Sequence, residues 1–434
     1  MWFPHSRLQL REILLIGGPA AVLVLAAFWL AYQFVQPAPP NQIFITTGSP
    51  TGAYYAFANR YRAELAKSGI TLDVLTSKGS VENLARLSDD EKRVDLALMQ
   101  GGIADERSAP NLISYGRVFL EPVWIFHRLD ASIDRLSALK GMRIAIGPQG
   151  SGTRKLAADL LRATGIDETN TKLLALGSDA AVEALGKGEV DAAFFTLAPE
   201  SPLLNTLMLD SSLKLLNLKR AEAYTRRFPY LSHVVLPEGA IDLARNLPSS
   251  NINMLAAQAA LVARKDLHPA LAWPLVDALK ATHSAGGMFQ RVGQFPQGID
   301  PEYPMSEDAQ RMYTSGTPFF QRFLPFWLAS LIERMIIMVV PVATILLPLF
   351  KLGPMIYEWR IRSRLLYWYA QLKAMEKRLG EGMTTTASGT DLSAEIDRID
   401  EAVSTIPVPL HYSDRLYELR AAIELVRQRI AART

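Results

Sequence analysis

The chain has 434 residues, of which 49% are hydrophobic and 21% are charged, and its formal net charge is +3. This length exceeds what one hydrophobic core usually supports, and the composition is typical of a folded chain that carries some membrane-embedded sequence. The absence of cysteine excludes disulfides, thiolate metal sites and a cysteine nucleophile, and the small net charge gives no indication of a nucleic-acid partner.

The first predicted element is an apolar segment over residues 13–35, preceded by a short N-terminal stretch, residues 1–12. Its roughly 23 uncharged residues can cross a hydrocarbon core of about 30 Å at the rise of an α-helix. No small-residue cleavage site stands before the proline-rich stretch that follows. We therefore expect a transmembrane helix that stays in place as an anchor.

Residues 41–325 alternate between strand-like and helix-like periods. "NQIFITTGS", "ITLDVLTSKGS" and "VDLALMQGG" are typical of strands and are separated by two amphipathic helical segments; "RIAIG", "KLLALG" and "VDAAFFT" repeat the rhythm later. This alternation predicts an α/β fold with two parallel-sheet lobes and a cleft between them. We expect lobe 1 at about residues 41–126 and 235–325, and lobe 2 at about 127–234.

A glycine-rich loop, "GPQGSGT" at residues 147–153, stands between a predicted strand and a predicted helix. A nucleotide P-loop needs a lysine after its second glycine, but Thr153 stands there, and the dinucleotide pattern G-x-G-x-x-G also fails. Two alternatives stay open: the helix start binds some other anion, or Ser151 merely caps the helix.

Similar turns occur in the first half, in "TTGSPTGAYY" and in "SKGSVENL", where Ser80 is the expected N-cap. Each turn alone is a capping motif, but three helix starts at one sheet edge would direct several N–H groups into a single cleft. We expect these loops at the surface, so that leucine at Ser80 or Ser151 would abolish stabilisation by the ligand and leave the fold intact. The predicted ligand-binding residues are Gly48, Ser49, Thr51, Tyr54, Ser80, Asn83, Gln100, Gly150, Ser151, Thr153 and Thr196.

Taken as a set, these motifs resemble those of the solute-binding receptors of tripartite ATP-independent periplasmic (TRAP) transporters, specifically the TAXI subfamily. The similarity runs from Ile45 through "TTGSPTGAYY", "KGSVENL", "VDLALMQ", "LKGMRIAIGPQGSGT" and "VDAAFFT". It implies a two-lobed, flytrap-like (periplasmic-binding-protein-like) fold and a small organic anion, such as glutamate, as ligand. The segment that begins at Phe295 is similar to a membrane-tethered branch of the family.

The sequence offers little to an enzyme. The histidines at positions 5, 127, 233, 268, 283 and 411 are far apart and form no H-E-x-x-H motif, and no G-x-S-x-G elbow surrounds Ser151. Asp95 and Asp191 stand at matching strand starts, where capping is the simpler interpretation. We expect no catalytic residue, no metal and no cofactor.

A second apolar segment, residues 331–350, predicts another transmembrane helix, with a buried helix of a soluble domain as the alternative. The following tail, residues 351–434, carries three apolar seams with steps of three and four residues, which predict three amphipathic helices that form a bundle or a docking surface. The seams are Leu365, Trp368, Leu372, Met375 and Leu379; Leu392, Ile396, Ile399, Val403 and Ile406; and Leu416, Leu419, Ile423, Val426 and Ile430.

Basic residues flank both apolar segments, and the positive-inside rule then gives two cytoplasmic termini and an extracytoplasmic middle in the inner membrane. These residues are Arg7, Arg11, Lys351, Arg360, Arg362 and Arg364. We expect a membrane-anchored receptor that delivers a small carboxylate or dicarboxylate to permease subunits. The alternative is a transmembrane sensor or scaffold that signals to a cytoplasmic protein through its tail.

Overall fold

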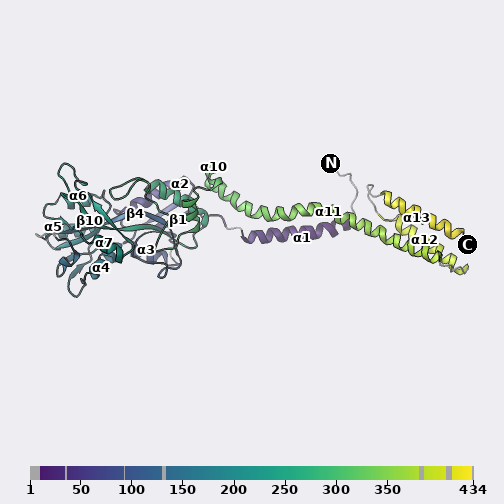
Figure 1. The fold of residues 1–434 in the computed structure, drawn as a ribbon, viewed down its shortest axis with the longest axis horizontal. Coiled ribbons are helices and arrows are strands. Elements are labelled where there is room, and N and C mark those ends of the chain that lie inside the picture. Colours follow the sequence, from purple (N-terminus) through teal and green to yellow (C-terminus); the bar gives the residue numbers. More distant parts are fainter. Residues whose placement is uncertain are drawn as a thin grey trace. The chain divides into compact units, whose positions relative to one another are not determined.

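The computed structural model describes residues 10–34, 37–91, 93–129, 133–380, 386–406 and 413–432. The chain divides into two compact units, Pro37–Ile332 and the combination of Met1–Gln36 with Glu333–Thr434. Figure 1 shows the sheet within the first unit and the long helices of the second, and each unit is described by itself below. Our expectations for His5, Arg7, Val35, His411 and Thr434 lie outside the described residues.

The first unit is built on one ten-stranded sheet with the order β2-β1-β3-β10-β4-β7-β5-β6, in which β8 also pairs with β4 and β9 with β10. The strands are β1 (Gln42–Thr46), β2 (Thr71–Leu75), β3 (Leu96–Gln100), β4 (Leu112–His127), β5 (Arg143–Ala145), β6 (Lys172–Leu174), β7 (Ala192–Thr196), β8 (Lys214–Leu215), β9 (Leu231–Leu236) and β10 (Ile252–Arg264).

The two halves of this sheet have matching topology. The three strands β2-β1-β3 are parallel to one another, as are β6-β5-β7. Between them run the long strands β4 and β10, which are antiparallel to each other and to the parallel strands that they meet. The sheet is therefore mixed, whereas we expected purely parallel lobes, because β4 and β10 each serve both halves. The expected lobe limits at 126/127 and 234/235 fall inside β4 and β9.

Helices connect the strands in the order that the sequence predicted, which confirms the α/β class. They are α2 (Ala53–Ala66), α3 (Ser80–Leu87), α4 (Gly152–Arg162), α5 (Ser178–Lys187), α6 (Pro202–Leu209), α7 (Ala221–Arg227), α8 (Ala272–His283), α9 (Glu307–Thr314) and α10 (Phe319–Phe323), with short 3-10 turns at Leu136–Leu139 and Pro269–Leu271. In the described residues, α2 and α3 follow the predicted strands of the first half, and α4 and α5 those of the second.

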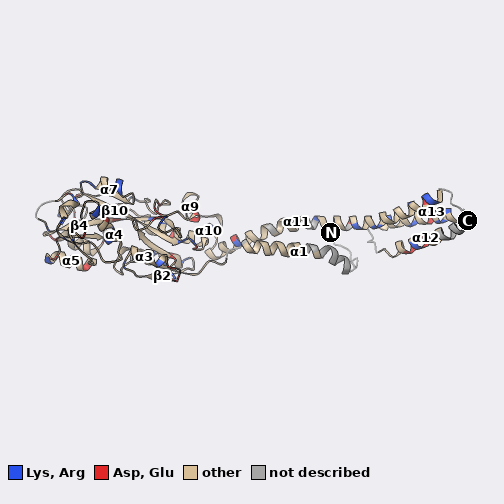
Figure 2. Ribbon diagram, turned by 90° about the horizontal axis from the view of Figure 1, so that it is seen from below, with Lys and Arg blue, Asp and Glu red and all other residues tan. Residues whose placement is uncertain are grey.

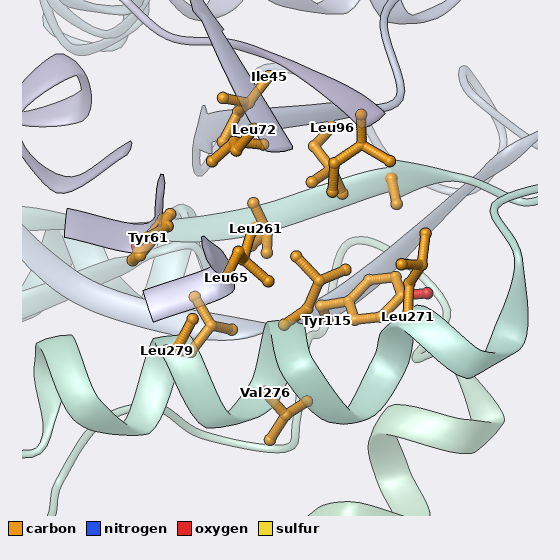
Figure 3. Packing of buried hydrophobic residues seen from close by; sticks show 14 of the residues in the cluster. Ile45, Tyr61, Leu65, Leu72, Leu96, Tyr115, Leu261, Leu271, Val276 and Leu279 are labelled. Atoms are coloured by element: carbon orange, nitrogen blue, oxygen red, sulfur yellow. The ribbon is translucent and has the colours of Figure 1, made fainter. Parts of the chain in front are cut away.

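Both faces of the sheet are covered by apolar cores. In the first half, α2 and α8 bury their apolar faces against β1, β3 and β10, where Leu65, Leu261 and Leu279 are fully buried (Figure 3). Each such leucine contributes about 2 kcal/mol through its removal from water. The second half has its own cores on the two faces, around Leu160 and Trp124 respectively. The strand ends between these cores are thus held in fixed positions.

The second unit contains α1 (Leu10–Phe34), α11 (Phe326–Gly380), α12 (Thr386–Ser404) and α13 (Ser413–Ala431), although α11 begins in the first unit. Within the described residues, Phe326–Pro348 is long and apolar enough to cross a membrane, with a mean hydropathy of 2.0, and α1 holds a shorter apolar stretch, Ala21–Gln33. The stretch Phe326–Pro348 contains nearly all of the predicted span 331–350. The stretch Ala21–Gln33 lies within the predicted span 13–35.

The tail forms the helical cluster that its periodicity predicted. Leu372, Ile399 and Ile423 are among its buried residues, one from each helix, and every residue of the three expected seams lies in this cluster or packs against it. The seam prediction is therefore confirmed. We expected either a bundle or a docking surface, and the three helices of this single chain form a bundle.

Candidate functional site

The candidate site lies where the two halves of the sheet meet. Gln100 ends β3, Thr196 ends β7, and these strands have matching places in the two halves. On β4, Phe119 belongs to the core of the first half and Val123 to that of the second, and Glu121 stands between them. Because these three residues alternate along one strand, they face the same side of the sheet. The starts of α3 and α4 meet at this junction, and Tyr54, in the first turn of α2, contacts Glu121.

Gln100 approaches the start of α4 across the junction. A Cβ atom placed on Gly152, the first residue of α4, would lie 1.9 Å from Oε1 of Gln100, so any larger residue at position 152 would require this amide to move. Gln100 is 3% exposed, and its Nε2 has no hydrogen-bond partner among the described residues. A buried amide donor without a partner is rare in folded proteins, since it costs about 1–3 kcal/mol.

The starts of α3 and α4 touch directly. The backbone N–H of Glu82 donates to the carbonyl oxygen of Gly150 at 3.3 Å. Gly79 has a φ of 125°, and a Cβ there would lie 3.1 Å from Cα of Ser151. Glycine at position 79 thus serves both a left-handed backbone and the close approach of two helix starts.

The serines of these two helices have different roles. Ser151 is the N-cap of α4, since its Oγ accepts from the N–H of Arg154. Ser80 is not a cap: Gly79 holds that position, and Ser80 Oγ accepts from the N–H of Gln100 at 3.0 Å. Ser80 is 2% exposed and Ser151 7%, so our expectation that both lie at the surface is wrong, and leucine at either position would collide with the packed junction.

Tyr54 and Glu121 form a polar pair at the same junction. The Tyr54 hydroxyl donates to Oε2 of Glu121 at 2.7 Å, and Tyr54 is largely buried. Burial raises the pKa of the Glu121 carboxyl to about 7, although the hydrogen bond from Tyr54 acts in the opposite direction. Burial also raises the pKa of Tyr54, with the Glu121 charge adding to the effect. Near neutral pH, the Glu121 carboxyl therefore holds its proton more often than an exposed carboxyl does.

On the second half, the hydroxyl groups of Thr153 and Thr196 are hydrogen-bonded to each other at 2.5 Å. Thr153 is in the first turn of α4 and Thr196 is the last residue of β7, so this contact ties the helix start to the strand end. The predicted residues that meet at the junction are thus Tyr54, Ser80, Gln100, Gly150, Ser151, Thr153 and Thr196.

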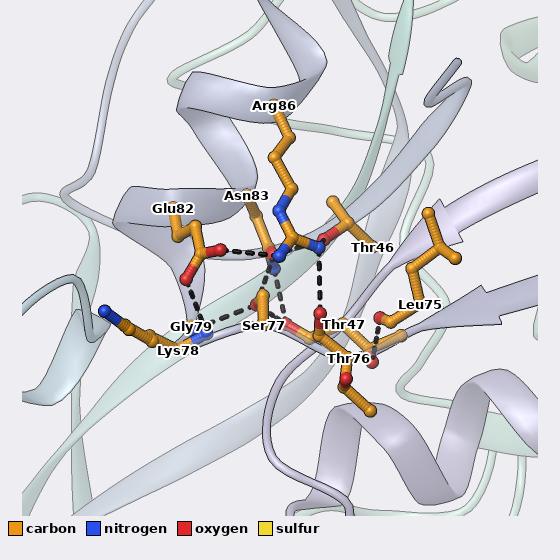
Figure 4. Close-up of polar contacts among 10 residues, drawn as sticks. All are labelled: Thr46, Thr47, Leu75, Thr76, Ser77, Lys78, Gly79, Glu82, Asn83 and Arg86. Carbon is orange, nitrogen blue, oxygen red and sulfur yellow. Dashed lines mark hydrogen bonds and ion pairs between the residues drawn. The ribbon is translucent and has the colours of Figure 1, made fainter. Parts of the chain in front are cut away.

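Asn83 has a structural position instead of a ligand-facing one (Figure 4). Its Oδ1 accepts from the hydroxyls of Thr46 and Ser77, and its Nδ2 donates to the carbonyl oxygens of Thr47 and Leu98. A carboxamide has two acceptor and two donor positions, and all four are occupied here. Asn83 therefore ties α3 to the strands β1 and β3 and has no bond left for a ligand.

The remaining predicted residues belong to the turn before α2. Ser49 and Thr51 are exposed, and Ser49 closes the turn by accepting from the N–H of Gly52 at 2.9 Å. Gly48 is buried, and its carbonyl oxygen accepts from the N–H of Ser77 at 3.1 Å. This turn fixes the start of α2, and the hydrogen bonds that the described residues give Ser49 and Thr51 lie within the turn itself.

Sequence reasoning missed two groups of residues. Glu121 was one, and the other is a buried network in which Arg117 contacts Asp300 at 3.2 Å and Glu302 at 3.0 Å. Glu302 also accepts from the N–H of Gly102, just beyond β3, at 2.7 Å. Burial raises the pKa of Glu302, although that N–H and the Arg117 guanidinium favour its charged form. The available signal was Arg117 and Glu121 inside the otherwise apolar run "LISYGRVFLEPVWIFH".

Within the described residues, no group of three His, Asp or Glu side chains is arranged to hold a metal ion. His283 illustrates a packing role: it is buried, contacts the Tyr61 hydroxyl through Nε2 and stacks on Phe119. Burial lowers its pKa to about 3, with the Arg60 charge acting in the same direction.

Known structures resemble this chain at low sequence identity. An ancestral arginine-binding protein bound to arginine is 14% identical, with 56% of this chain and 92% of that chain covered and a TM-score of 0.38. The alkanesulfonate-binding protein SsuA from Xanthomonas axonopodis pv. citri is 19% identical, with 57% and 73% covered and a TM-score of 0.37. A histidine kinase sensor domain with similarity to periplasmic binding proteins is 15% identical, with 55% and 89% covered and a TM-score of 0.37.

A family model describes the chain more directly. It matches residues 45–284, which is more than half of the chain and includes both halves of the sheet and every predicted site residue. The chain belongs to the NMT1-like family.

Proposed function

We propose that residues 41–325 form an extracytoplasmic, periplasmic-binding-protein-like receptor that binds a small organic anion between the two halves of its sheet. The observation that carries the proposal is the Gln100 amide, whose Nε2 is buried at the junction without a partner among the described residues. A ligand carboxylate oxygen would satisfy this donor. The proposal is for a binding protein and not for an enzyme.

The surroundings of Gln100 suit a carboxylate. The positive ends of the α3 and α4 dipoles meet there, and helix starts favour anions. A protonated Glu121 can donate a hydrogen bond to the ligand, whereas an ionised Glu121 repels an anion. Because burial raises the pKa of Glu121 to about 7, the affinity for an anion should fall as the pH rises through this range. Residues Tyr54, Ser80 and Thr153 supply further hydroxyl groups.

The finer assignment is a tethered TAXI-type receptor for TRAP uptake. Its support is the motif set in the sequence, together with the apolar stretches of α1 and α11 on either side of the sheet-containing unit. In this proposal both helices span the inner membrane, both termini are cytoplasmic, and permease subunits take over the ligand.

A second candidate is a transmembrane ligand sensor. The observation that favours it is α11, one helix of 55 residues that runs from the sheet-containing unit into the tail cluster. A soluble receptor needs no such connection. A sensor would use it to carry a change at the junction to the tail, where a cytoplasmic protein would bind.

The test is a thermal-shift screen of the segment 37–325 with small mono- and dicarboxylates and with neutral analogues. We expect a carboxylate to raise the melting temperature, since a ligand that binds only the folded state stabilises it. Gly152→Ala should abolish the shift, because its methyl group would occupy the position of the Gln100 amide.

Gly177→Ala is the matched control. Gly177 stands at the N-cap of α5, and a Cβ there meets nothing within 4 Å. This variant should respond to the ligand as the parent does. A full ligand response in Gly152→Ala would show that the ligand binds elsewhere, and a response to neutral analogues alone would refute the anion. Cross-linking of the full chain to a multi-span permease would favour uptake over sensing.

A further inference from the structure

An open groove of about 660 Å³ lies in the tail cluster, between α11 and the end of α12. All of its lining residues belong to the helical unit, and none takes part in the junction described above. The lining consists of Trp359, Arg360, Ser363, Arg364, Tyr367, Trp368, Ala402, Thr405 and Ile406.

The groove has a basic wall. Arg360 and Arg364 are four residues apart on α11, so they share one face of the helix, and both line the groove. From Lys351 to Arg364 the chain has four basic residues and one acidic residue, Glu358. Figure 2 shows Lys and Arg spaced along this part of α11 beyond its apolar stretch. The planar guanidinium group matches the oxygens of a phosphate.

Arg364 and Glu358 each interact with another group of the chain. A guanidinium has five N–H donors, so it can take part in internal contacts and in the binding of a phosphate at the same time.

The groove also has an aromatic wall. Trp359 is 69% exposed on α11, and Trp368 also lines the groove from the same helix. Tryptophan is enriched where a membrane meets water, because its ring is apolar and its N–H group can be hydrated. The aromatic wall is therefore suited to contact with the headgroup region of a lipid.

The end of α12 completes the groove. The groove brings Ala402, Thr405 and Ile406, at the end of α12, against the segment 359–368 of α11. This segment is the part of the tail cluster nearest the apolar stretch Phe326–Pro348. Exposed apolar residues continue past Lys351, at Met355 and Ile356, up to the rim.

We propose that this groove binds the headgroup of an anionic phospholipid, with Arg360 and Arg364 on the phosphate and the tryptophans beside the glycerol and the first acyl carbons. The site is separate from the junction around Gln100, and its place beside the membrane rests on the topology proposed above. It would hold the tail cluster against the cytoplasmic surface of the membrane.

The test uses the full chain in detergent, titrated with phosphatidylglycerol or phosphatidylcholine and followed by native mass spectrometry. We expect phosphatidylglycerol to bind at least about tenfold more tightly. The double variant Arg360→Gln with Arg364→Gln should lose most of this preference. Arg362→Gln is the matched control, because Arg362 is exposed on the same helix and does not line the groove.

Ala402→Phe is the second variant, since it fills the groove without a change in charge. It should weaken phosphatidylglycerol binding about as much as the double variant does, and it decides the matter alone if the double variant does not fold. The proposal is overturned if Arg362→Gln has an equal effect, because the attraction is then a general one to negative charge. Full binding by Ala402→Phe also overturns it, as does equally tight binding of free glycerol phosphate, which would indicate a site for a soluble ligand.

Discussion

Replacement of Glu121 by Gln should make the sheet-containing unit more stable above pH 7 and leave its stability unchanged near pH 4. In the parent, burial raises the pKa of Glu121 from an ordinary 4.5 to about 7. Between these values the unfolded chain has lost the proton and the folded chain keeps it, so the parent loses stability as the pH rises. Above pH 7 the loss in the free energy of unfolding is constant. It is about 3 kcal/mol, because each unit of difference between the two pKa values corresponds to about 1.36 kcal/mol. Gln keeps an oxygen for the Tyr54 hydroxyl and removes the charge.

The measurement is urea denaturation of the segment 37–325 at pH 4 and at pH 8.5, for the parent and for Glu121→Gln. Glu200→Gln is the control, since Glu200 lies in an exposed loop, and its difference from the parent should be the same at both pH values. The result that refutes the reasoning is a difference in unfolding free energy between Glu121→Gln and the parent that is the same at pH 4 and at pH 8.5. Glu121 would then ionise as it does in water, and the argument from burial would be wrong.

Three other predictions follow from the tail, from Asn83 and from the apolar stretches. Leu419→Asp with Val426→Asp should cost several kcal/mol, because both side chains are buried in the tail cluster, and circular dichroism of the tail with an unchanged helical signal would contradict the packing. Asn83→Ala should cost about 3 kcal/mol in urea denaturation of 37–325, since three buried partners and the half-buried Ser77 lose their bonds; a loss below about 0.5 kcal/mol would be incompatible with them. A reporter active only outside the cytoplasm should be active after Asn41 and silent after Thr434, and activity at Thr434 would refute the two-span topology.

Much of the fold could be predicted from the sequence, because most of its helices and strands follow local periodicity. β1 to β3 and β5 to β7, the helices between them and the seams of the tail all follow apolar patterns of period 2 or 3.6. The strands β4 and β10 were not predicted. Their pairing joins residues such as Glu121 and Ala257, which are distant in the chain, and no local pattern indicates that one strand will serve two halves of a sheet.

The candidate site divides in the same way. Ser151 caps α4, which was one of the two alternatives predicted from the sequence. Such a cap can be predicted because its two residues are only three positions apart in the chain. The hydrogen bonds of Asn83 could not be predicted, because its four partners come from the end of β1, from β3 and from the loop after β2, which meet only in the folded chain. Burial of Ser80 likewise depends on the approach of Gly79 to Ser151 across the junction. Contacts between halves are set by packing, which spacing along the chain does not encode.

The path of the chain through its first core has a consequence for biogenesis. That core combines residues from β1 to β4 with residues from β10, α8 and α9, and the contact between Tyr61 and His283 joins positions 222 residues apart. The N-terminal strands must therefore wait for partners that are synthesised much later, while the second half, with its own cores between these segments, can form first. Contacts of such long range slow folding and leave apolar surface exposed in the meantime. We expect the new chain to depend on holdase chaperones until residues near position 310 have been synthesised and are free to fold.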